Sequence, residues 1–268
     1  LILSFIGVLI LSPDSLLIRL ANLDDFSLIF YRSALPIVTI LIFLIYTYQK
    51  SFLKSFYLIG IPGIIYAILY AITHICFVYS IQNTAVANTL VLIASAPIFA
   101  ALFSVFILKE IPSLFTWIVI LIAMFAMIII GVGSFTTTGL YGDLMALIVA
   151  IGMGFSMVLV RLFKNKDLVP ACLLGCLISA LYALPFGINF DLNNDQFVLI
   201  FIMCLIILPI PFMIMTISPK FAPAHEVALI FLLESVLGTA WVWFVIKEIP
   251  PLNTIIGGAL LLGSVTIF

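Results

Sequence analysis

Residues 106–117 read "FILKEIPSLFTW", and residues 244–255 read "FVIKEIPPLNTI". Seven of the twelve positions are identical, and the two stretches begin 138 residues apart, at 106 and 244. Similarity at a fixed offset is typical of an internal repeat, in which one structural unit occurs twice. We therefore predict that the chain consists of two related halves, residues 1–135 and residues 136–268.

The composition around these two stretches is that of a membrane protein. Of the 268 residues, 66% are hydrophobic and only 8% are charged, far less charge than a soluble surface requires. A helix needs about 20 apolar residues to cross the hydrocarbon layer. Short polar clusters such as "NLDD", "YQKS", "KNKD" and "NNDQ" divide the chain into segments of about this length. These segments are 1–21, 26–48, 56–81, 84–108, 113–132, 140–162, 168–188, 196–218, 222–246 and 251–268. We predict an all-α integral membrane protein with ten transmembrane helices, five in each half.

An odd number of spans in each half has a topological consequence, because the second half must then enter the membrane from the opposite side. Loops that follow even-numbered segments contain seven of the ten Lys and Arg residues: Lys50, Lys54, Lys109, Arg161, Lys164, Lys166 and Lys220. Arg19, Arg32 and Lys247 lie near the other loops, and Arg19 is close enough to the boundary to snorkel. By the positive-inside rule, Lys109 is cytoplasmic and Lys247 external.

This topology predicts two inverted repeats with both termini cytoplasmic, in a multi-pass protein of the bacterial inner membrane. The first segment is already apolar at Leu1, without a methionine. We favour a transmembrane helix whose polar lead-in precedes this numbering over a cleaved signal peptide.

Three polar residues of the first three segments fall at one depth. Asp14, Arg32 and His74 lie six or seven residues from the external ends of their segments, about 10 Å at 1.5 Å per residue. Opposite charges at equal depth can pair, so we predict an ion pair between Asp14 and Arg32 with His74 nearby. Two interpretations stay open. The pair either only fixes how the helices pack, or it lines a substrate cavity in which protonation of Asp14 would release Arg32.

Other intramembrane polar residues are candidates for the same path. Glu234 stands near the centre of the ninth segment, where a buried carboxylate is costly. It is either a cavity-lining residue or a protonated residue that packs between helices. Asn88 and Ser95 of the fourth segment can face the same path. Prolines predict bends, most clearly at Pro13 in the first segment and around Ile210 in the eighth.

Several features of the sequence resemble those of a known family. Two five-helix halves, each with an acidic turn after its fourth helix, and the alanine-rich stretch "NTAVANTLVLIASAPIFAALFSVFILKE" look like the EamA branch of the drug/metabolite transporter superfamily. In that family a small-Ser-Pro motif and a Glu-Pro motif occur in the two halves. Here they are matched by Ala94-Ser95-Ala96-Pro97 and Leu233-Glu234-Ser235, so the second proline is a serine. The resemblance implies import or export of amino acids, nucleosides or related solutes.

We therefore predict a secondary transporter of a small charged or zwitterionic metabolite, such as an amino acid, working by alternating access. No Walker A sequence is present, so an ion gradient or solute exchange would supply the energy. A passive channel is the first alternative. An intramembrane enzyme is less favoured, because the two histidines lie on opposite sides of the membrane midplane and no His-Glu-x-x-His motif occurs.

The remaining expectations concern cofactors and partners. The four cysteines show no zinc-site spacing, and we expect neither a metal nor a cofactor. A net charge of −1 argues against a nucleic-acid partner. The expected partners are a small-molecule substrate, the lipid bilayer, and protons or a counter-substrate. The oligomeric state stays open, and a homodimer is compatible with the sequence.

Overall fold

The computed structural model describes the chain except residues 85, 132–138, 248–251 and 268. The side chains of residues 19, 86, 87, 130, 131, 235, 239, 242, 246, 254 and 265–267 also lie outside the description. The predicted position of the Arg19 side chain therefore lies outside the described residues, and so does most of the second Lys-Glu-Ile-Pro turn.

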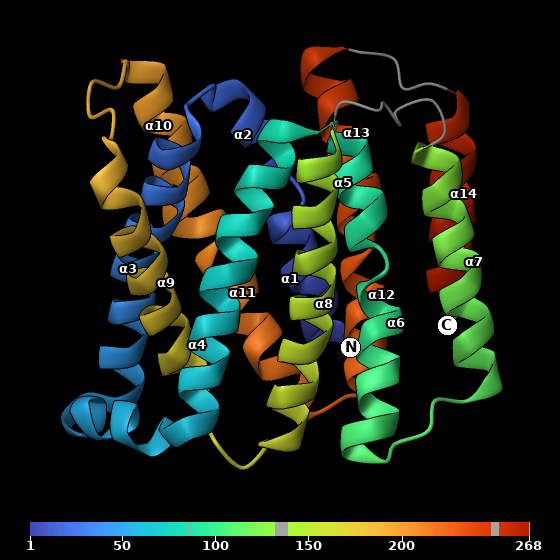
Figure 1. Ribbon diagram of the computed structural model, residues 1–268, viewed down its shortest axis with the longest axis horizontal. Helices are drawn as coiled ribbons and strands as arrows, with labels where there is room; N and C mark the ends of the chain where they lie inside the picture. Colours follow the sequence, from blue (N-terminus) through green and yellow to red (C-terminus); the bar gives the residue numbers. More distant parts are fainter. Residues whose placement is uncertain (85, 132–138, 248–251, 268) are drawn as a thin grey trace.

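Every regular element of the described residues is helical (Figure 1). The α-helices are α1 (Ile2–Leu11), α2 (Asp14–Ala21), α3 (Asp25–Tyr48), α4 (Phe52–Asn83), α5 (Val86–Ile93), α6 (Ala96–Phe103), α7 (Leu114–Gly131), α8 (Leu140–Leu162), α9 (Val169–Ala183), α10 (Asn194–Ile202), α11 (Pro209–Ile217), α12 (Ala224–Phe231), α13 (Leu233–Ile246) and α14 (Leu252–Ile267). Shorter turns of 3-10 helix are η1 (Gln49–Ser51), η3 (Leu184–Phe186) and η5 (Ser218–Lys220), and π-helical turns are η2 (Ser104–Leu108) and η4 (Met203–Ile207).

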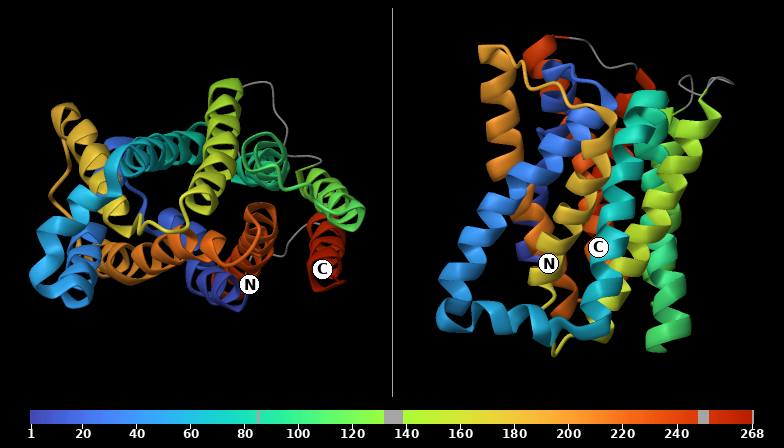
Figure 2. Two further views of the ribbon diagram at one scale, coloured as in Figure 1. Left: turned by 90° about the horizontal axis from the view of Figure 1, so that it is seen from below. Right: turned by 60° about the vertical axis from the view of Figure 1, so that its left-hand side comes forward.

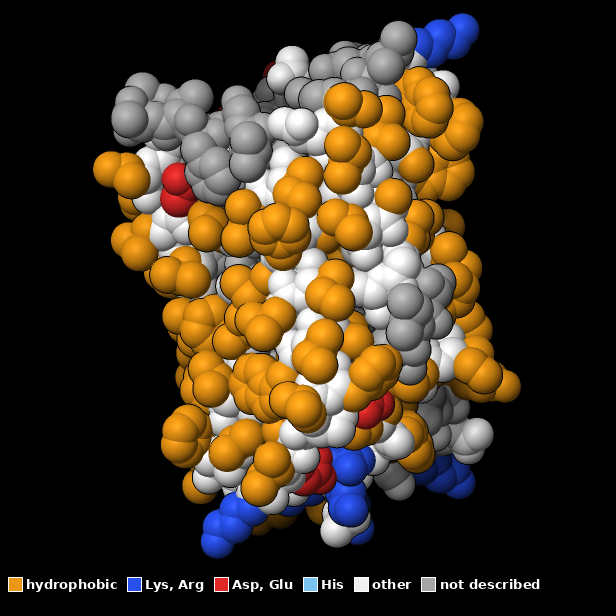
Figure 3. Space-filling model, turned by 90° about the vertical axis from the view of Figure 1, so that its right-hand side faces the viewer, with side chains coloured by type: hydrophobic (Ala, Val, Ile, Leu, Met, Phe, Trp, Pro, Cys, Tyr) orange, Lys and Arg blue, Asp and Glu red, His pale blue; other side chains and the backbone are white. Residues whose placement is uncertain are grey.

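Six helical stretches of the described residues are long and apolar enough to cross a membrane. They are Asp25–Asn83, Asn88–Leu108, Leu140–Leu162, Val169–Phe186, Asn194–Lys220 and Ala224–Val245. Shorter apolar helices cover Ile2–Ile18, Leu114–Ile129 and Ile255–Ser264. Many large apolar side chains on the outer surface are exposed, as a lipid-facing surface requires (Figure 3). The predicted all-α membrane fold is therefore confirmed, whereas the count of ten spans stays a prediction.

The predicted bends in the first and eighth segments are present. The first segment breaks between α1 and α2 at Ser12 and Pro13. The eighth is interrupted by η4, where the amide of Leu208 donates to the carbonyl of Met203, five residues back. Pro209 follows directly and cannot donate a backbone hydrogen bond, so the regular i to i−4 pattern cannot continue through it.

The repeat found in the sequence is visible in the backbone. The helix carrying the first motif ends at Lys109 with φ 57° and ψ 24°, and its counterpart ends at Lys247 with φ 59° and ψ 24°. Each of these helices is also broken at a matching place, near Ala94 in the first half and at Leu232 in the second. The η2 end of α6 and the end of α13 lie at opposite ends of the bundle (Figure 1). The matched elements thus run in opposite directions.

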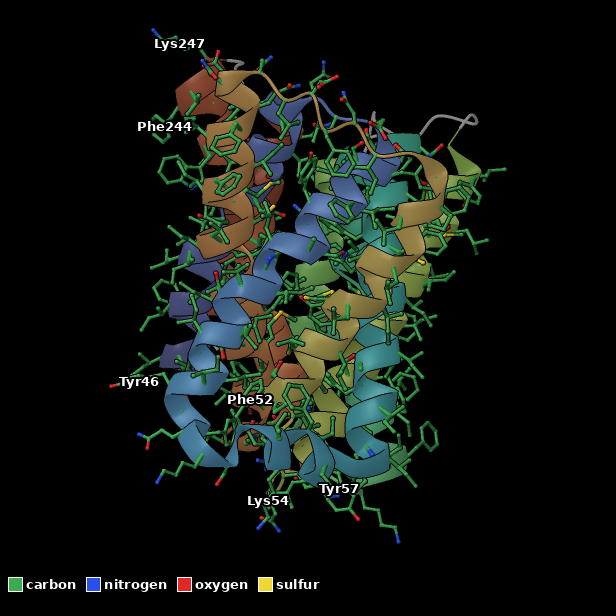
Figure 4. The ribbon with its side chains drawn as sticks, turned by 90° about the vertical axis from the view of Figure 1, so that its left-hand side faces the viewer. Tyr46, Phe52, Lys54, Tyr57, Phe244 and Lys247 are labelled. Carbon is green, nitrogen blue, oxygen red and sulfur yellow. The ribbon has the colours of Figure 1, made fainter. Side chains whose placement is uncertain are left out.

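A backbone break divides the third predicted segment near its start. Helix α4 starts at Phe52, but Gly60 has φ 58° and ψ −158°, which divides the helix. The residues before Gly60 lie across the lower end of the bundle, and the chain turns upward after it (Figures 2 and 4). The break lies about four residues inside the third predicted segment, which begins at about residue 56, and the point where that span begins stays a prediction.

Replacing Gly60 with alanine is expected to destabilise the protein by about 1–3 kcal/mol, because side-chain-bearing residues scarcely populate this backbone region. A Cβ atom here would also lie 3.1 Å from Nζ of Lys166. Thermal unfolding of the purified protein in lipid nanodiscs measures the loss. Gly263→Ala is the matched control, since a Cβ atom there meets no atom within 4 Å, and an equal loss for both variants would contradict the account.

The helices that carry the polar residues pack closely around the middle of the bundle. Helix α4 packs against α8 and α9, and α3 packs against α9. Gly154 of α8 allows close contact with α6, since a Cβ atom there would lie 2.8 Å from the backbone nitrogen of Ala100. The two halves therefore interlock instead of forming separate units. The cavity described next lies where their helices meet.

Candidate functional site

A cavity of about 80 Å³ lies between the two halves. Its first-half lining comes from α1 to α5, and its second-half lining from α8, α11 and α13. The lining residues are Leu11, Asp14, Arg32, Tyr70, Thr73, His74, Phe77, Leu90, Ile93, Val149, Met153, Phe212, Met215 and Glu234. Asp14, Ile93 and Glu234 each lie beside a helix break.

The predicted ion pair is present in the wall of this cavity. Nη1 of Arg32 donates to Oδ1 of Asp14 at 2.6 Å, and Nη2 donates to Oδ2 at 3.0 Å. Both residues are 2% exposed. Asp14 lies in the first turn of α2, where the helix dipole favours a negative charge. The two-point geometry matches the planar guanidinium to the carboxylate, so each charge neutralises the other inside the membrane.

Apart from Asp14, the neighbours of the Arg32 guanidinium are a methionine sulfur and an aromatic ring. Nη1 also contacts Sδ of Met203 at 3.6 Å, and the guanidinium carbon lies 5.5 Å from the centre of the Phe77 ring. Such a cation over an aromatic face is stabilised by the ring quadrupole. Nε of Arg32 is buried and has no partner among the described residues. Nη2 has two hydrogens and donates one of them to Asp14, so Arg32 keeps two unused donors among the described residues, the Nε hydrogen and the second Nη2 hydrogen.

His74 has a defined hydrogen-bonding role. Oγ of Ser33 donates its hydrogen to the carbonyl of Ile29 at 2.7 Å, and the same oxygen lies 3.2 Å from Nδ1 of His74. Since the serine hydrogen is already used, Nδ1 must be the donor to Ser33. In a neutral imidazole Nε2 is then an acceptor, and this atom is buried without a partner among the described residues. The ring also stacks on Tyr70, with ring centres 6.3 Å apart.

Glu234 enters the cavity from the other half of the chain. It lies in the first turn of α13, one residue after the break at Leu232 and Leu233, and is only partly buried. Among the residues that the structure describes, no side chain or backbone group makes a hydrogen bond with its carboxylate. The cavity thus brings together four of the predicted site residues: Asp14, Arg32, His74 and Glu234.

The other two predicted site residues do not line this cavity. Asn88 is fully buried in α5, and its Nδ2 donates to Oγ1 of Thr84 at 3.3 Å. Ser95 donates to the carbonyl of Leu92 at 2.6 Å, at the break before α6. Both hydrogen bonds are local to the fourth segment. A direct role for Asn88 or Ser95 with a ligand stays a prediction.

Several residues that line the cavity were not predicted from the sequence, although the helical spacing of α4 indicates them. Thr73 and Phe77 of α4 line the cavity together with Tyr70 and His74. Residues three and four positions apart share one face of a helix, so the position of His74 indicates this stripe. Ser33, which orients His74, has no comparable pattern. Within the described ranges, no group of three or more His, Cys, Asp or Glu side chains is placed to hold a metal ion.

A second polar cluster lies at the lower end of the bundle. Nη2 of Arg161 lies 3.2 Å from Oε1 of Glu110, which joins the second half to the first. Nζ of Lys220 lies 3.3 Å from Oδ1 of Asp167, and the hydroxyl of Tyr48 donates to Oδ2 of the same carboxylate. On the face shown in Figure 3, Lys and Arg side chains gather mainly at this end. Figure 4 places Lys54 at this end and Lys247 at the other.

Comparisons with known proteins place the chain in a family. A search of the curated proteins found no match. Twenty-nine chains of solved structures are similar to it. One crystal structure of a protein superposes with a TM-score of 0.79 at 16% sequence identity, covering 99% of this chain and 95% of its own, which shows a shared fold.

The model of the EamA-like transporter family matches the chain twice, over residues 1–132 and 140–268. The resemblance seen in the acidic turns and the alanine-rich fourth segment is thereby confirmed. With its apolar helices, the chain is an integral, multi-pass membrane protein. It belongs to the EamA-like transporter family, within the drug/metabolite transporter superfamily.

Proposed function

We propose that the protein is a secondary transporter that carries a small charged or zwitterionic metabolite through the cavity by alternating access. One observation supports this most strongly: an ion pair and an unpaired carboxylate from opposite halves line one intramembrane cavity. Buried charge inside a membrane is costly and marks solute or proton pathways. The energy would come from protons or from a counter-substrate.

In this proposal the chain crosses the membrane ten times, as two inverted five-helix repeats. Two observations support it: the stretch Asp25–Asn83 has 59 residues, enough for two spans, and the matched helices end at opposite ends of the bundle. The end where the ion pairs of Glu110 and Asp167 lie would face the cytoplasm, since it carries most of the Lys and Arg residues. Both termini would then be cytoplasmic, and a bacterial inner membrane fits this topology.

A passive channel is the second candidate function. It would need a continuous path through the bundle, whereas the ion pair between Arg161 and Glu110 joins the two halves at the lower end. An intramembrane enzyme would need a nucleophile with its base at one depth. His74 is held by Ser33, which donates to a backbone carbonyl, so no such pair is formed there.

The test is solute uptake into proteoliposomes. A panel of radiolabelled amino acids, amines and carboxylic acids is offered with and without a pH gradient, and protein-free liposomes serve as the control. We expect saturable uptake of at least one class that a pH gradient or an internal counter-solute accelerates. Uptake that does not saturate, and that neither a pH gradient nor an internal counter-solute accelerates, would indicate a channel and contradict the proposal.

Replacing Glu110 with glutamine is expected to favour the conformation that is open at the lower end. The side chains of Arg161 and Glu110 are 21% and 39% exposed. An ion pair this exposed contributes up to about 1 kcal/mol, so the open population should rise by a factor of about two to five. The rate at which an impermeant thiol reagent labels a cavity cysteine from that end measures the change. The charge-swapped double variant Glu110→Arg with Arg161→Glu should restore the parental rate, and failure of both effects would contradict this role.

A further inference from the structure

The charges that line the cavity do not balance. Asp14 and Arg32 neutralise each other through two short hydrogen bonds. Glu234 is the only other Asp, Glu, Lys or Arg in the lining. The cavity therefore carries one net negative charge when this carboxylate is ionised. A compensating cation would remove the cost of holding that charge inside the membrane.

The hydrogen-bonding groups point to the same kind of ligand. Nε2 of His74 is a buried acceptor without a partner among the described residues, and the Glu234 carboxylate lines the same cavity with no hydrogen bond from a described residue. The Thr73 hydroxyl already donates to the backbone carbonyls of Leu69 and Tyr70. On the donor side, Arg32 keeps its Nε hydrogen and the second hydrogen of Nη2 without an acceptor within the described part of the chain. The free groups of the cavity therefore suit a ligand that donates hydrogen bonds, as an ammonium group does with its three N–H bonds.

The rest of the lining is apolar and the space is small. Leucine, isoleucine, valine and methionine side chains surround it, together with the rings of Tyr70, Phe77 and Phe212. By the same measure of volume one water needs about 10–15 Å³, so about 80 Å³ holds roughly five to eight atoms of that size. Aromatic faces also attract ammonium groups. The shape and lining fit a short apolar chain with one cationic end.

Building on the proposed transport function, we propose that the cavity selects a small amphipathic primary amine in its cationic form. The ammonium group donates to the Glu234 carboxylate and to Nε2 of His74, and the apolar body lies against Phe77, Phe212 and the aliphatic side chains. A carboxylate on the same solute would find the two unused N–H groups of Arg32, whose charge Asp14 already neutralises, and would face the charge of Glu234. The site therefore discriminates against zwitterions and, more strongly, against anions.

Three matched probes test this selectivity with the purified protein in nanodiscs, by isothermal titration calorimetry. Butylammonium is the cation, norvaline is the same skeleton with a carboxylate added, and pentanoate is the anion. We expect butylammonium to bind at least tenfold more tightly than norvaline, with pentanoate weaker still. Trimethylbutylammonium, which keeps the charge and lacks N–H donors, should bind more weakly than butylammonium.

Two variants connect the selectivity to the proposed groups. Glu234→Gln should weaken butylammonium binding at least tenfold, whereas Glu226→Gln, on the same span but outside the cavity, should leave it unchanged. Tighter binding of norvaline or pentanoate, or butylammonium binding that is insensitive to Glu234→Gln, would overturn the inference. The transport proposal would stand in each of these cases, because it is decided by the uptake of any solute class. Binding of none of the probes would also overturn the inference.

Discussion

Asp14→Asn is expected to destabilise the protein by about 3–5 kcal/mol, because it leaves the guanidinium of Arg32 buried without a countercharge. Arg32 is 2% exposed, and its remaining neighbours are the sulfur of Met203 and the ring of Phe77. None of these replaces a carboxylate. Unfolding of parent and variant in nanodiscs, followed by circular dichroism against temperature and denaturant, measures the loss. A variant as stable as the parent would show that the pair is not desolvated.

A double variant distinguishes a structural pair from a functional one. Asp14→Leu combined with Arg32→Met removes both charges and keeps apolar volume, and such replacements of buried pairs are often neutral or stabilising. We expect the double variant to recover most of the stability and to remain inactive in solute uptake, because Asp14 and Arg32 form part of the cavity wall. Recovery of uptake together with stability would show that the pair only holds helices α2 and α3 together.

Glu234→Gln is expected to reduce uptake at least tenfold while leaving the fold intact. A hydrogen bond to a charged group is worth about 1.5–3 kcal/mol, so the loss of the charge lowers solute affinity by a factor of about ten to a hundred. Stability should be unchanged or slightly higher, since no described residue forms a hydrogen bond with this carboxylate and the variant removes a charge from inside the membrane. Initial rates of uptake at several solute concentrations measure the effect.

Glu226→Gln is the matched control for that substitution. Glu226 lies in the first turn of α12, on the same predicted span, and does not line the cavity. We expect its uptake rate to stay within about twofold of the parent. Equal losses for the two glutamate variants would show that the effect of Glu234 is not specific to the cavity.

The sequence predicts features that follow from regular helix geometry. A fixed rise of 1.5 Å per residue places Asp14 and Arg32 at one depth, and the structure joins them. Prolines remove backbone donors, so the breaks at Pro13 and before Pro209 were foreseeable. The repeated Lys-Glu-Ile-Pro turn likewise predicts that two helices end alike, and Lys109 and Lys247 share one backbone conformation.

Features that depend on which helices are neighbours could not be predicted. Glu234 was predicted as a possible cavity-lining residue, but nothing near it in the sequence shows that α13 packs against α2, which brings it into one cavity with Asp14 and Arg32. The rotation of the fourth segment about its own axis directs Asn88 and Ser95 into local hydrogen bonds. The sequence does not predict the break at Gly60, because a glycine within an apolar run is compatible with a continuous helix.

Alternating access itself is tested most directly by a single cysteine in the cavity. Met153 of α8 lines it, and the four native cysteines are all buried, so Met153→Cys is made with those four replaced by alanine. Phe125→Cys is the control, since its side chain is 61% exposed on the apolar outer surface of α7. An impermeant thiol reagent is applied to right-side-out and to inside-out vesicles.

We predict that the reagent labels position 153 from either face. Adding transported solute or a pH gradient should raise the labelling rate from one face and lower it from the other. Position 125 should react from neither face. Labelling of position 153 from one face alone under every condition would contradict alternating access and leave the cavity a static pocket.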